Sequence, residues 1–455
     1  MDDEHEPAGE TFFDLPVEPS SDAVRESPRA RPRMQRADRQ QVRLRPSDLD
    51  ALLPPEHPAR MVWGWVEAQD LSGFEAAIRA VEGHPGRPPI DPAILVALWL
   101  YATVEGVGSA RALDRLCDEH DAYRWICGGV GVNHHTLADF RVQHGELLDG
   151  LLSDSIAAWL AEGLVSLDRT AQDGMRVRAS AGSGSYRGRD GLERALDVAR
   201  QRVLTLRAEL EADPALASRR MATRRERAAR ERAEALERAL ARLPQIEERK
   251  RRPDYRGRRD APARVSTSDT EVDFMAFPDG GRRPAWNVQL ATDTGSGIIV
   301  GADVTSGSDV QQLRPMVEQL VTRYGRAPAE HLVDGGYVDR GALEHLATAC
   351  GTTLYMPVGR PRGGYDRDPH LPRRRDTPAV AEWRVRMGTE KAKAIYRLRA
   401  QTAECSNADL RNHGLRAFNV RGRPKAIAVL LWHVLAHNLV RAVSLRAATA
   451  VAATA

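Results

Sequence analysis

The sequence "HLVDGGYVDRGAL", from His331 to Leu343, contains a short apolar run that ends at an acid, Asp334, followed by two glycines. Asp and Gly are ordinary turn residues, so the pattern is compatible with a simple turn. An acid at the end of a strand is also typical of sites that hold metals or substrates. Taken alone, the stretch favours the turn. The rest of the chain has to decide between the two interpretations.

The composition indicates a globular protein. The chain has 455 residues, of which 42% are hydrophobic and 28% are charged, enough for two or three domains. No apolar run reaches the roughly 18 residues of a membrane span, and the acidic start "MDDEHEPAGE" is unlike a secretory signal. The four cysteines form no CxxC pair, which is typical of free thiols in a reducing cytoplasm. We therefore expect a cytoplasmic protein with no membrane segment.

The positive charge is concentrated in two blocks, although the formal net charge is only +3. Residues 176–260 contain 24 Arg and Lys against 14 Asp and Glu, and residues 360–425 contain 17 against 7. Arginine binds phosphate well, and phosphate contacts supply most non-specific DNA affinity. The blocks suggest a polyanionic partner, although the first could equally be a solvated helix surface.

Sequence periodicity divides the chain into segments. Residues 1–45 are rich in Pro, Glu, Arg and Ser and are predicted to be a disordered tail. Residues 46–165 show helical spacing, with a start near Asp91-Pro92, an N-cap at Ser109 and a stop at Gly128-Gly129, and are predicted to form a helical N-terminal domain.

Within residues 186–261, residues 190–250 are almost all helix formers, with leucines every three to four positions and a break at Asp213-Pro214. We predict an Arg-rich helical hairpin inserted into a second domain, for which a lone coiled-coil spacer is the alternative. That second domain comprises residues 166–185 and 262–440, and residues 441–455 form a C-terminal tail.

Without the insert, the second domain is predicted to run β-β-β-α-β-α-β-α. Two of its strands form a hairpin across "DTGSG", and "SDVQQLRPMVEQLVTRYG" is predicted to be a capped amphipathic helix. This order is that of a ribonuclease H-like fold, a mixed sheet whose first three strands are antiparallel. The predicted fold class is therefore α/β (α+β), with a ribonuclease H-like sheet, a helical N-terminal domain and the helical insert.

Three acids occupy significant positions in this order. Asp173 lies in the first strand, Asp334 ends the fourth, and Glu404 lies in a long C-terminal helix. The first and fourth strands are neighbours in such a sheet, so the two aspartates would face each other. Converging carboxylates repel one another, and a divalent cation with oxygen ligands relieves the repulsion. The pattern indicates a centre for phosphoryl transfer, whereas Glu404 alone would be an ordinary partner of its neighbouring arginines.

The motifs together resemble a family. "DGMRVRASA" at Asp173, "LVDGGYVD" at Asp334 and "YRLRAQTAECSNADLRNHGLRAFNVRGRPKA" around Glu404 are similar to segments of DDE transposases of bacterial insertion sequences. "IDPAILVALWLYATVEGVGSARALDRLCDEHDAYRWICGG" resembles the helical N-terminal domain of one group of these enzymes, and the resemblance covers about residues 45–440.

The resemblance implies that Asp173, Asp334 and Glu404 form the catalytic triad and bind Mg²⁺ or Mn²⁺, as two ions. It also implies DNA as the partner, in the form of terminal inverted repeats and target DNA, with a homodimer on the DNA and a location at the bacterial nucleoid. The residues expected to contact DNA lie on or after the Glu404 helix: Tyr396, Arg397, Arg399, Arg411, Arg416 and Arg421.

The sequence departs from the family's pattern near Glu404. Asn407 stands at an aromatic position, where it is expected to loosen the packing of the helix, and Arg411 stands at a lysine position. A domesticated or defective relative that only binds DNA remains an alternative, as does a ribonuclease H-like nuclease that does not join strands.

Smaller candidates have ordinary interpretations beside the functional ones. Asn287, Gln289 and Asp293 alternate along one strand and could equally face the site or form a polar side. Asp303 is a weak candidate for a supporting acid, and Asp339 is expected to cap a helix. Trp286 could stack on an extruded base, but a core position is the default.

Overall fold

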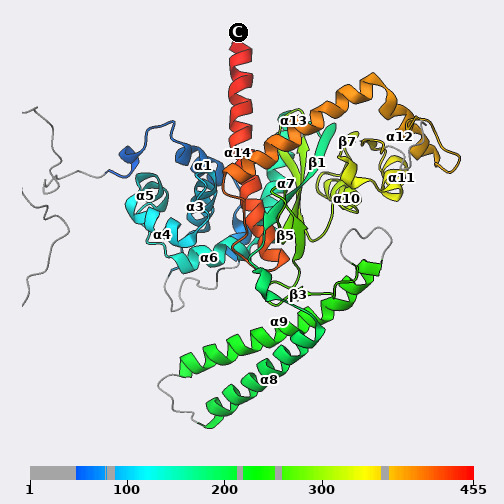
Figure 1. The fold of residues 1–455 in the computed structure, drawn as a ribbon. Helices are drawn as coiled ribbons and strands as arrows, with labels where there is room; N and C mark the ends of the chain where they lie inside the picture. The colour runs from blue at the N-terminus through cyan, green and yellow to red at the C-terminus, as the bar shows by residue number, and fades with distance from the viewer. Residues whose placement is uncertain are drawn as a thin grey trace, which may run out of the picture. The chain divides into compact units, whose positions relative to one another are not determined.

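The computed structural model describes residues 48–76, 78, 88–212, 219–251, 259–359 and 368–454 (Figure 1). The predicted disordered tail, the break at Asp213-Pro214 and most of the loop after Arg360 lie outside these residues.

The N-terminal part is helical, as predicted. α3 begins at Pro92 behind Asp91, whose side chain accepts a hydrogen bond from the Ala93 amide, and Ser109 caps α4 in the same way. Gly128 ends α5 in the left-handed conformation (φ 55°), as expected for a helix stop. The elements are η1 (Asp50–Leu52), α1 (Pro58–Glu67), α2 (Ser72–Ala76), α3 (Pro92–Val104), α4 (Ala110–Glu119), α5 (Asp121–Cys127), α6 (His134–Gln143) and α7 (Gly145–Ala161).

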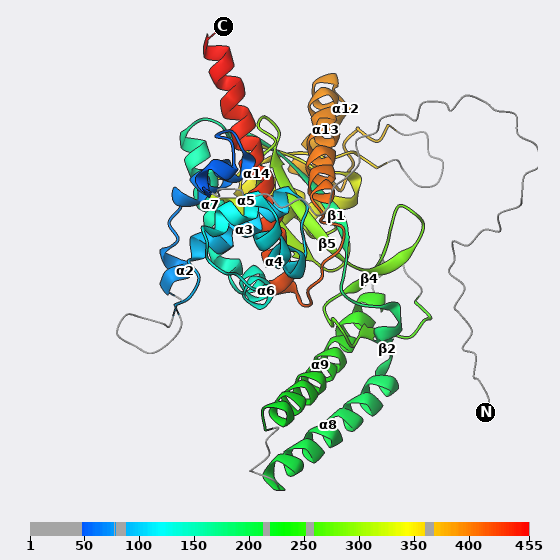
Figure 2. The ribbon, with the colours of Figure 1, turned by 90° about the vertical axis from the view of Figure 1, so that its left-hand side faces the viewer.

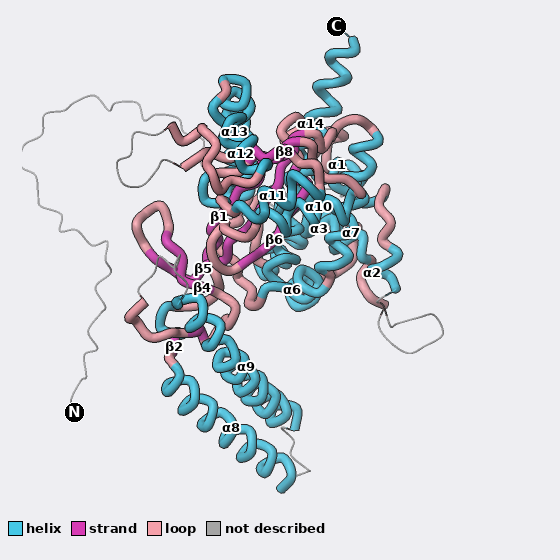
Figure 3. Tube along the Cα trace, turned by 90° about the vertical axis from the view of Figure 1, so that its right-hand side faces the viewer, coloured by secondary structure: helices cyan, strands magenta, loops and turns pink. Residues whose placement is uncertain are grey.

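A mixed sheet follows, in the order β4-β5-β1-β7-β8, with β6 also paired to β5; Figure 3 shows the strands in magenta among the cyan helices. β5 is antiparallel to β1, β4 and β6, whereas β7 is parallel to β1 and to β8. The predicted ribonuclease H-like order is thus confirmed, including the β5–β6 hairpin. The strands are β1 (Arg169–Arg178), β4 (Asp273–Ala276), β5 (Arg282–Asp293), β6 (Ile299–Thr305), β7 (Glu330–Leu332) and β8 (Thr353–Tyr355).

The insert is a pair of long helices that lie side by side, α8 (Arg189–Ala212) and α9 (Arg219–Arg251) (Figure 2). Their leucines, among them Leu192 and Leu236, form a hydrophobic cluster of their own. η2 (Ser183–Ser185) and the antiparallel strands β2 (Tyr186–Arg187) and β3 (Val265–Ser266) lie where the hairpin leaves and re-enters the domain.

Helices cover both faces of the sheet. Met316 and Leu320 of α10 (Leu313–Tyr324) lie against Gly301 of β6 on one face. On the other, Ser406 of α13 (Glu390–Asn412) accepts a hydrogen bond from Thr292 of β5. The remaining helical elements are η3 (Gly335–Tyr337), α11 (Arg340–Ala349), α12 (Pro378–Gly388) and α14 (Arg423–Thr454).

α14 joins the N-terminal helices to the sheet. It packs against α3, α6 and α7 as well as β6, so that a single hydrophobic core includes Trp99, Val300 and Trp432. Residues 441–455, predicted as a separate tail, continue this helix as far as Thr454. By length and composition alone, Arg423–Ala452 is long and apolar enough to span a membrane, but 78% of its most apolar window is buried inside the protein. α14 therefore has the character of a core helix.

Candidate active site

The two predicted aspartates lie at matching distances beyond the last pair of two adjacent strands, Asp173 on β1 and Asp334 just past the end of β7. The parallel pairing of β1 with β7 ends at Ala171 opposite Leu332. Asp173 follows Ala171 by two residues, and Asp334 follows Leu332 by two. β1 continues past the end of β7, so β7 does not cover the edge of β1 beside Asp173. Side chains from either face of the sheet can meet at this edge.

Asp173 is held by α13. The Asn407 amide donates to Asp173 Oδ2 over 3.1 Å, and Arg399 Nη1 lies 3.6 Å from Asp173 Oδ1. Burial raises the pKa of Asp173, and the Arg399 charge and the Gly174 amide oppose this rise. The negative charges of Asp334 and Asp309 raise it further, as expected for carboxylates that share a site.

Asp309 was not predicted as a site residue. It lies between β6 and α10, in the segment predicted to cap that helix, but α10 begins at Leu313 and has no side-chain cap. Instead, Asp309 Oδ1 accepts hydrogen bonds of 2.8 Å from both Asn287 and Gln289. Asn287 and Gln289 therefore both face Asp309, and their position at a catalytic site stays a prediction. An acid placed just after a strand, as Asp334 is, was the signal in the sequence.

Two glycines make room for the acids. A Cβ on Gly174 would overlap Asp309 Oδ1, and a Cβ on Gly336 would stand 2.9 Å from Asp334 Oδ1 and 3.7 Å from Asp309 Oδ2. The turn interpretation of the Asp334 stretch is also correct, since Asp334 Oδ1 accepts from the Gly336 amide over 2.7 Å. Asp334 thus shapes the turn. It also belongs to the group of carboxylates formed by Asp173, Asp309 and Asp334, which we call the acidic site.

A buried network of polar side chains orients Gln289, which donates to Asp309. Gln289 Oε1 accepts hydrogen bonds from Gln172 and from the Tyr337 hydroxyl, which turns its amide nitrogen towards Asp309. Gln172 in turn contacts His331 of β7 over 3.0 Å. Burial lowers the pKa of His331 to about 3, so this imidazole is neutral and adds no cation to balance the acids.

Glu404 lies apart from these contacts. The buried side of α13 includes Ala403, Ser406 and Asn407, whereas Glu404 is exposed. Among the described residues Glu404 makes no hydrogen bond or ion pair. Contrary to the expectation of looser packing, Asn407 is buried and bonded to Asp173.

The residues expected to contact DNA fall into two groups. Tyr396 and Arg399 lie at the site: burial raises the pKa of Tyr396, Arg399 opposes this, and the charges of Asp334 and Asp173 add to it. The others are exposed, and the backbone carbonyls of Arg411 and Ser180 accept from the guanidinium groups of two of them. These exposed residues are Arg397, Arg411, Arg416 and Arg421.

The smaller candidates have structural roles. Asp293 accepts from Ser296 in the β5–β6 turn, and Asp303 pairs with Arg423 over 2.7 Å. Asp339 caps α11, as predicted. Trp286 is only 1% exposed, which leaves no face for an extruded base.

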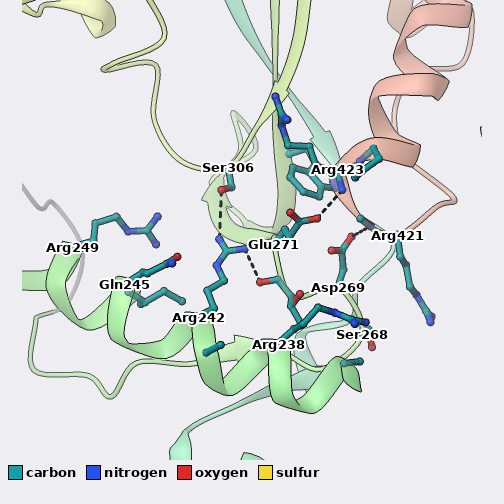
Figure 4. A pocket seen from close by; sticks show the side chains of 17 residues that line it. Arg238, Arg242, Gln245, Arg249, Ser268, Asp269, Glu271, Ser306, Arg421 and Arg423 are labelled. Carbon is teal, nitrogen blue, oxygen red and sulfur yellow. Dashed lines mark hydrogen bonds between the residues drawn. The ribbon is translucent and has the colours of Figure 1, made fainter. Parts of the chain in front are cut away.

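A second polar region lies between α9 and the start of α14 (Figure 4). We call it the arginine pocket; it encloses about 840 Å³ and is lined by Arg238, Arg242, Arg249, Arg421 and Arg423 together with Asp269 and Glu271. Arg242 and Arg249 both pair with Asp273, at 3.1 and 2.5 Å. Figure 4 shows Arg242 also directed towards Ser306.

The residues of the acidic site are suited to a divalent cation. The carboxylates of Asp309 and Asp334 lie close enough to Asp173 to raise its pKa, Arg399 lies beside Asp173, and Asn407 Oδ1 is buried with no hydrogen-bond partner in the described part of the chain. No three Asp, Glu, His or Cys side chains among the described residues are grouped closely enough to enclose a metal ion. Mg²⁺ needs only one or two protein carboxylates, because water and substrate phosphates complete its octahedron.

Comparison with known families agrees with this geometry. Residues 47–143 match the family described as a transposase domain (DUF772), and residues 269–439 match the transposase DDE domain. The chain is a DDE-type DNA transposase. The second match includes Asp309, Asp334 and Glu404 but begins after Asp173. No curated protein and no solved structure matches the chain. DDE domains generally depend on a divalent metal, and the transposase acts on DNA.

Proposed function

We propose that the transposase cuts DNA at the ends of its element and joins them to target DNA, with Asp173, Asp334 and Glu404 as the catalytic acids. The observation that carries the proposal is that Asp173 on β1 and Asp334 just past the end of β7 each lie two residues beyond the last pair of these adjacent parallel strands. Water would attack the phosphodiester at the element end and release a 3′-hydroxyl, which then displaces a target-DNA oxygen in line.

Asp173, Asp334 and Glu404 would hold Mg²⁺ or Mn²⁺, as two ions. When bound, such ions stabilise both the attacking and the leaving oxygen of phosphoryl transfer. The negative charge that Arg399 leaves unbalanced at Asp173 and Asp334 supports the presence of cations there. Arg399 and Asn407 fix both oxygens of Asp173 from α13, and Tyr396 packs beside Arg399.

DNA would bind along the exposed basic residues. The N-terminal helices would read the terminal inverted repeats, while the insert and the Arg-rich segment around α13 would follow the phosphate backbone. Arg397, Arg411, Arg416 and Arg421 are exposed and available for phosphates. Two element ends must be joined in one event, which calls for a homodimer on DNA. The reaction places the protein at the bacterial nucleoid, in the cytoplasm.

A non-catalytic DNA-binding relative is the second candidate. The exposed position of Glu404, without a contact to either aspartate, favours it. Glu404 nevertheless lies one helical turn before Asn407, on the side of α13 that DNA can approach. A cleavage experiment separates the two candidates.

The test incubates the full-length protein with a duplex that carries the element end, in Mg²⁺ and in Mn²⁺. Asp334→Ala should lower the cleavage rate by at least about 10³-fold while DNA binding is retained, since removing a catalytic group has effects of this size. Asp339→Ala is the matched control, because that acid lies five residues away and only caps α11.

Binding without cleavage by the unmutated protein would contradict the catalytic proposal and favour the non-catalytic relative. Cleavage without joining to a target would instead indicate a nuclease that does not transfer strands.

A further inference from the structure

The arginine pocket has walls from two parts of the chain that lie far apart in the sequence. One wall is α9 of the insert, with Arg238, Arg242 and Arg249, and the other is the segment that leads into α14, with Arg421 and Arg423 (Figure 4). Its volume of about 840 Å³ lies within the range of pockets that hold small organic molecules. The pocket is therefore larger than a single inorganic ion needs.

The inner charges of the pocket are matched within the chain. As described above, the inner arginines pair with acids of β4 and β6. The two acids that line the pocket accept hydrogen bonds from the backbone at the start of α14: Asp269 accepts from the Gly422 amide over 3.1 Å, and Glu271 accepts from the Arg423 amide over 2.8 Å. These contacts fix the walls and the shape of the pocket.

Two further arginines that line the pocket are not matched in this way. Arg421 is exposed and forms no ion pair with another described residue, and its guanidinium donates to the neutral Ser180 carbonyl. Arg238 is also exposed, and its ion pair with Glu234 of the same helix spans 3.9 Å. An ion pair of this length between exposed side chains contributes little. Weakly balanced positive charge therefore borders the pocket on both walls.

A buried donor without an acceptor also lines the pocket. Trp286 of β5 is only 1% exposed, and its indole N–H has no hydrogen-bond partner in the described part of the chain. Leaving a buried N–H without an acceptor is costly, so its place in the pocket wall indicates an acceptor that comes from outside the chain. Phosphate oxygens accept hydrogen bonds, and arginine binds them well.

The pocket adjoins the acidic site along β5 and β6. Asn287, the residue after Trp286, donates to Asp309 over 2.8 Å and to the Gly307 carbonyl over 3.2 Å. Ser306, next to Gly307, lines the pocket. A DNA strand bound at the acidic site can therefore continue into the pocket, which favours a phosphate of that strand over a free nucleotide as the occupant.

We propose that the arginine pocket holds one phosphate of the bound DNA strand, which Arg238 contacts from α9 and Arg421 contacts from the segment before α14. This inference rests on the proposed function, because it assumes that DNA binds beside the acidic site. The shared phosphate would connect the insert to the DDE domain and fix the strand at both.

The test measures the affinity of the full-length protein for a labelled duplex that carries the element end, by fluorescence anisotropy in EDTA at several salt concentrations. Arg238→Ala and Arg421→Ala should each weaken binding a few-fold and lower the slope of log K against log salt by about 0.9. The double variant should also lower the slope by about 0.9, and not by about 1.8, because both arginines contact the same phosphate.

Arg230→Ala is the matched control, since Arg230 is exposed on the same helix and does not line the pocket. Combined with Arg421→Ala, its effect on the slope should be additive. Additive slopes for Arg238→Ala and Arg421→Ala, or an unchanged slope for Arg238→Ala, would overturn the inference, because the two arginines would then share no phosphate.

Thymidine 5′-monophosphate distinguishes a free nucleotide from a phosphate of DNA. Titration calorimetry should show no difference between the unmutated protein and the double variant in their binding of this nucleotide. If the double variant loses nucleotide binding but keeps its affinity for the duplex, the pocket serves free nucleotides and the inference is wrong.

The proposed function and the inference fail in different ways. If the unmutated protein does not bind the element-end duplex, the proposed function fails and the inference fails with it. If the unmutated protein binds and, in Mg²⁺, cleaves the duplex while the double variant binds it equally well, the proposed function stands and the inference alone is wrong.

Discussion

The acidic site and the arginine pocket are both rich in charged side chains, and they balance charge differently. In the arginine pocket, Arg242 and Arg249 share Asp273, and Arg423 pairs with Asp303. In the acidic site, Arg399 is the one described cation that forms an ion pair with Asp173, whereas Asp309 and Asp334 have no ion pair in the described part of the chain. Charges matched within the chain hold elements together, whereas unmatched charges indicate a partner from outside.

The largest difference between the regions should appear in stability. Asp273→Asn leaves two arginines without their mostly buried carboxylate, and we expect a loss of about 3 kcal/mol in the free energy of unfolding. Asp334→Asn keeps an acceptor for the Gly336 amide and relieves repulsion, so its free energy of unfolding should change by less than about 0.5 kcal/mol. Urea denaturation of both variants in EDTA measures the difference. Equal losses would show that charge balance does not distinguish the two regions.

A smaller effect is expected within the acidic site. Asn407→Ala removes the amide that donates to Asp173 Oδ2, leaving Arg399 and the Gly174 amide to orient that carboxylate. The cleavage rate should fall about 10- to 100-fold, as when a group that orients a metal ligand is lost. Ser406→Ala is the control, because Ser406 is buried beside Asn407 but bonds to Thr292. If both variants lower the rate equally, Asn407 serves packing and not the site.

The smallest effect should come from the rim of the arginine pocket. Arg421 is exposed and, among the described residues, its guanidinium donates to the Ser180 carbonyl alone, so Arg421→Ala should weaken DNA binding a few-fold. The slope of log K against log salt should decrease by about 0.9, the value for one lost phosphate contact. Arg446→Ala is the control, because Arg446 is bound to Glu162. An unchanged slope for Arg421→Ala would remove this residue from the DNA-binding surface.

The sequence by itself determined the order of the elements and the positions of Asp173 and Asp334 within that order. Turn residues, helix caps and periodicity are local signals, and they suffice to place Asp173 on the first strand and Asp334 at the end of the fourth. Since the strand order restricts which strands can be neighbours, the proximity of these two acids could be predicted. The position of the helical insert followed from composition, because residues 190–250 are almost all helix formers.

Only the tertiary structure decided which other side chains meet Asp173 and Asp334. The side of α13 that faces the sheet is set by packing over its whole length, and it brings Asn407 rather than Glu404 against Asp173. The path between β6 and α10 depends on partners far away in the sequence, Asn287 and Gln289, so the contacts of Asp309 could not be predicted from its local sequence. The same holds for α14, because only the helices and strands that bury its apolar side chains show that it is a core helix. Local sequence specifies an element, but long-range packing specifies what its side chains touch.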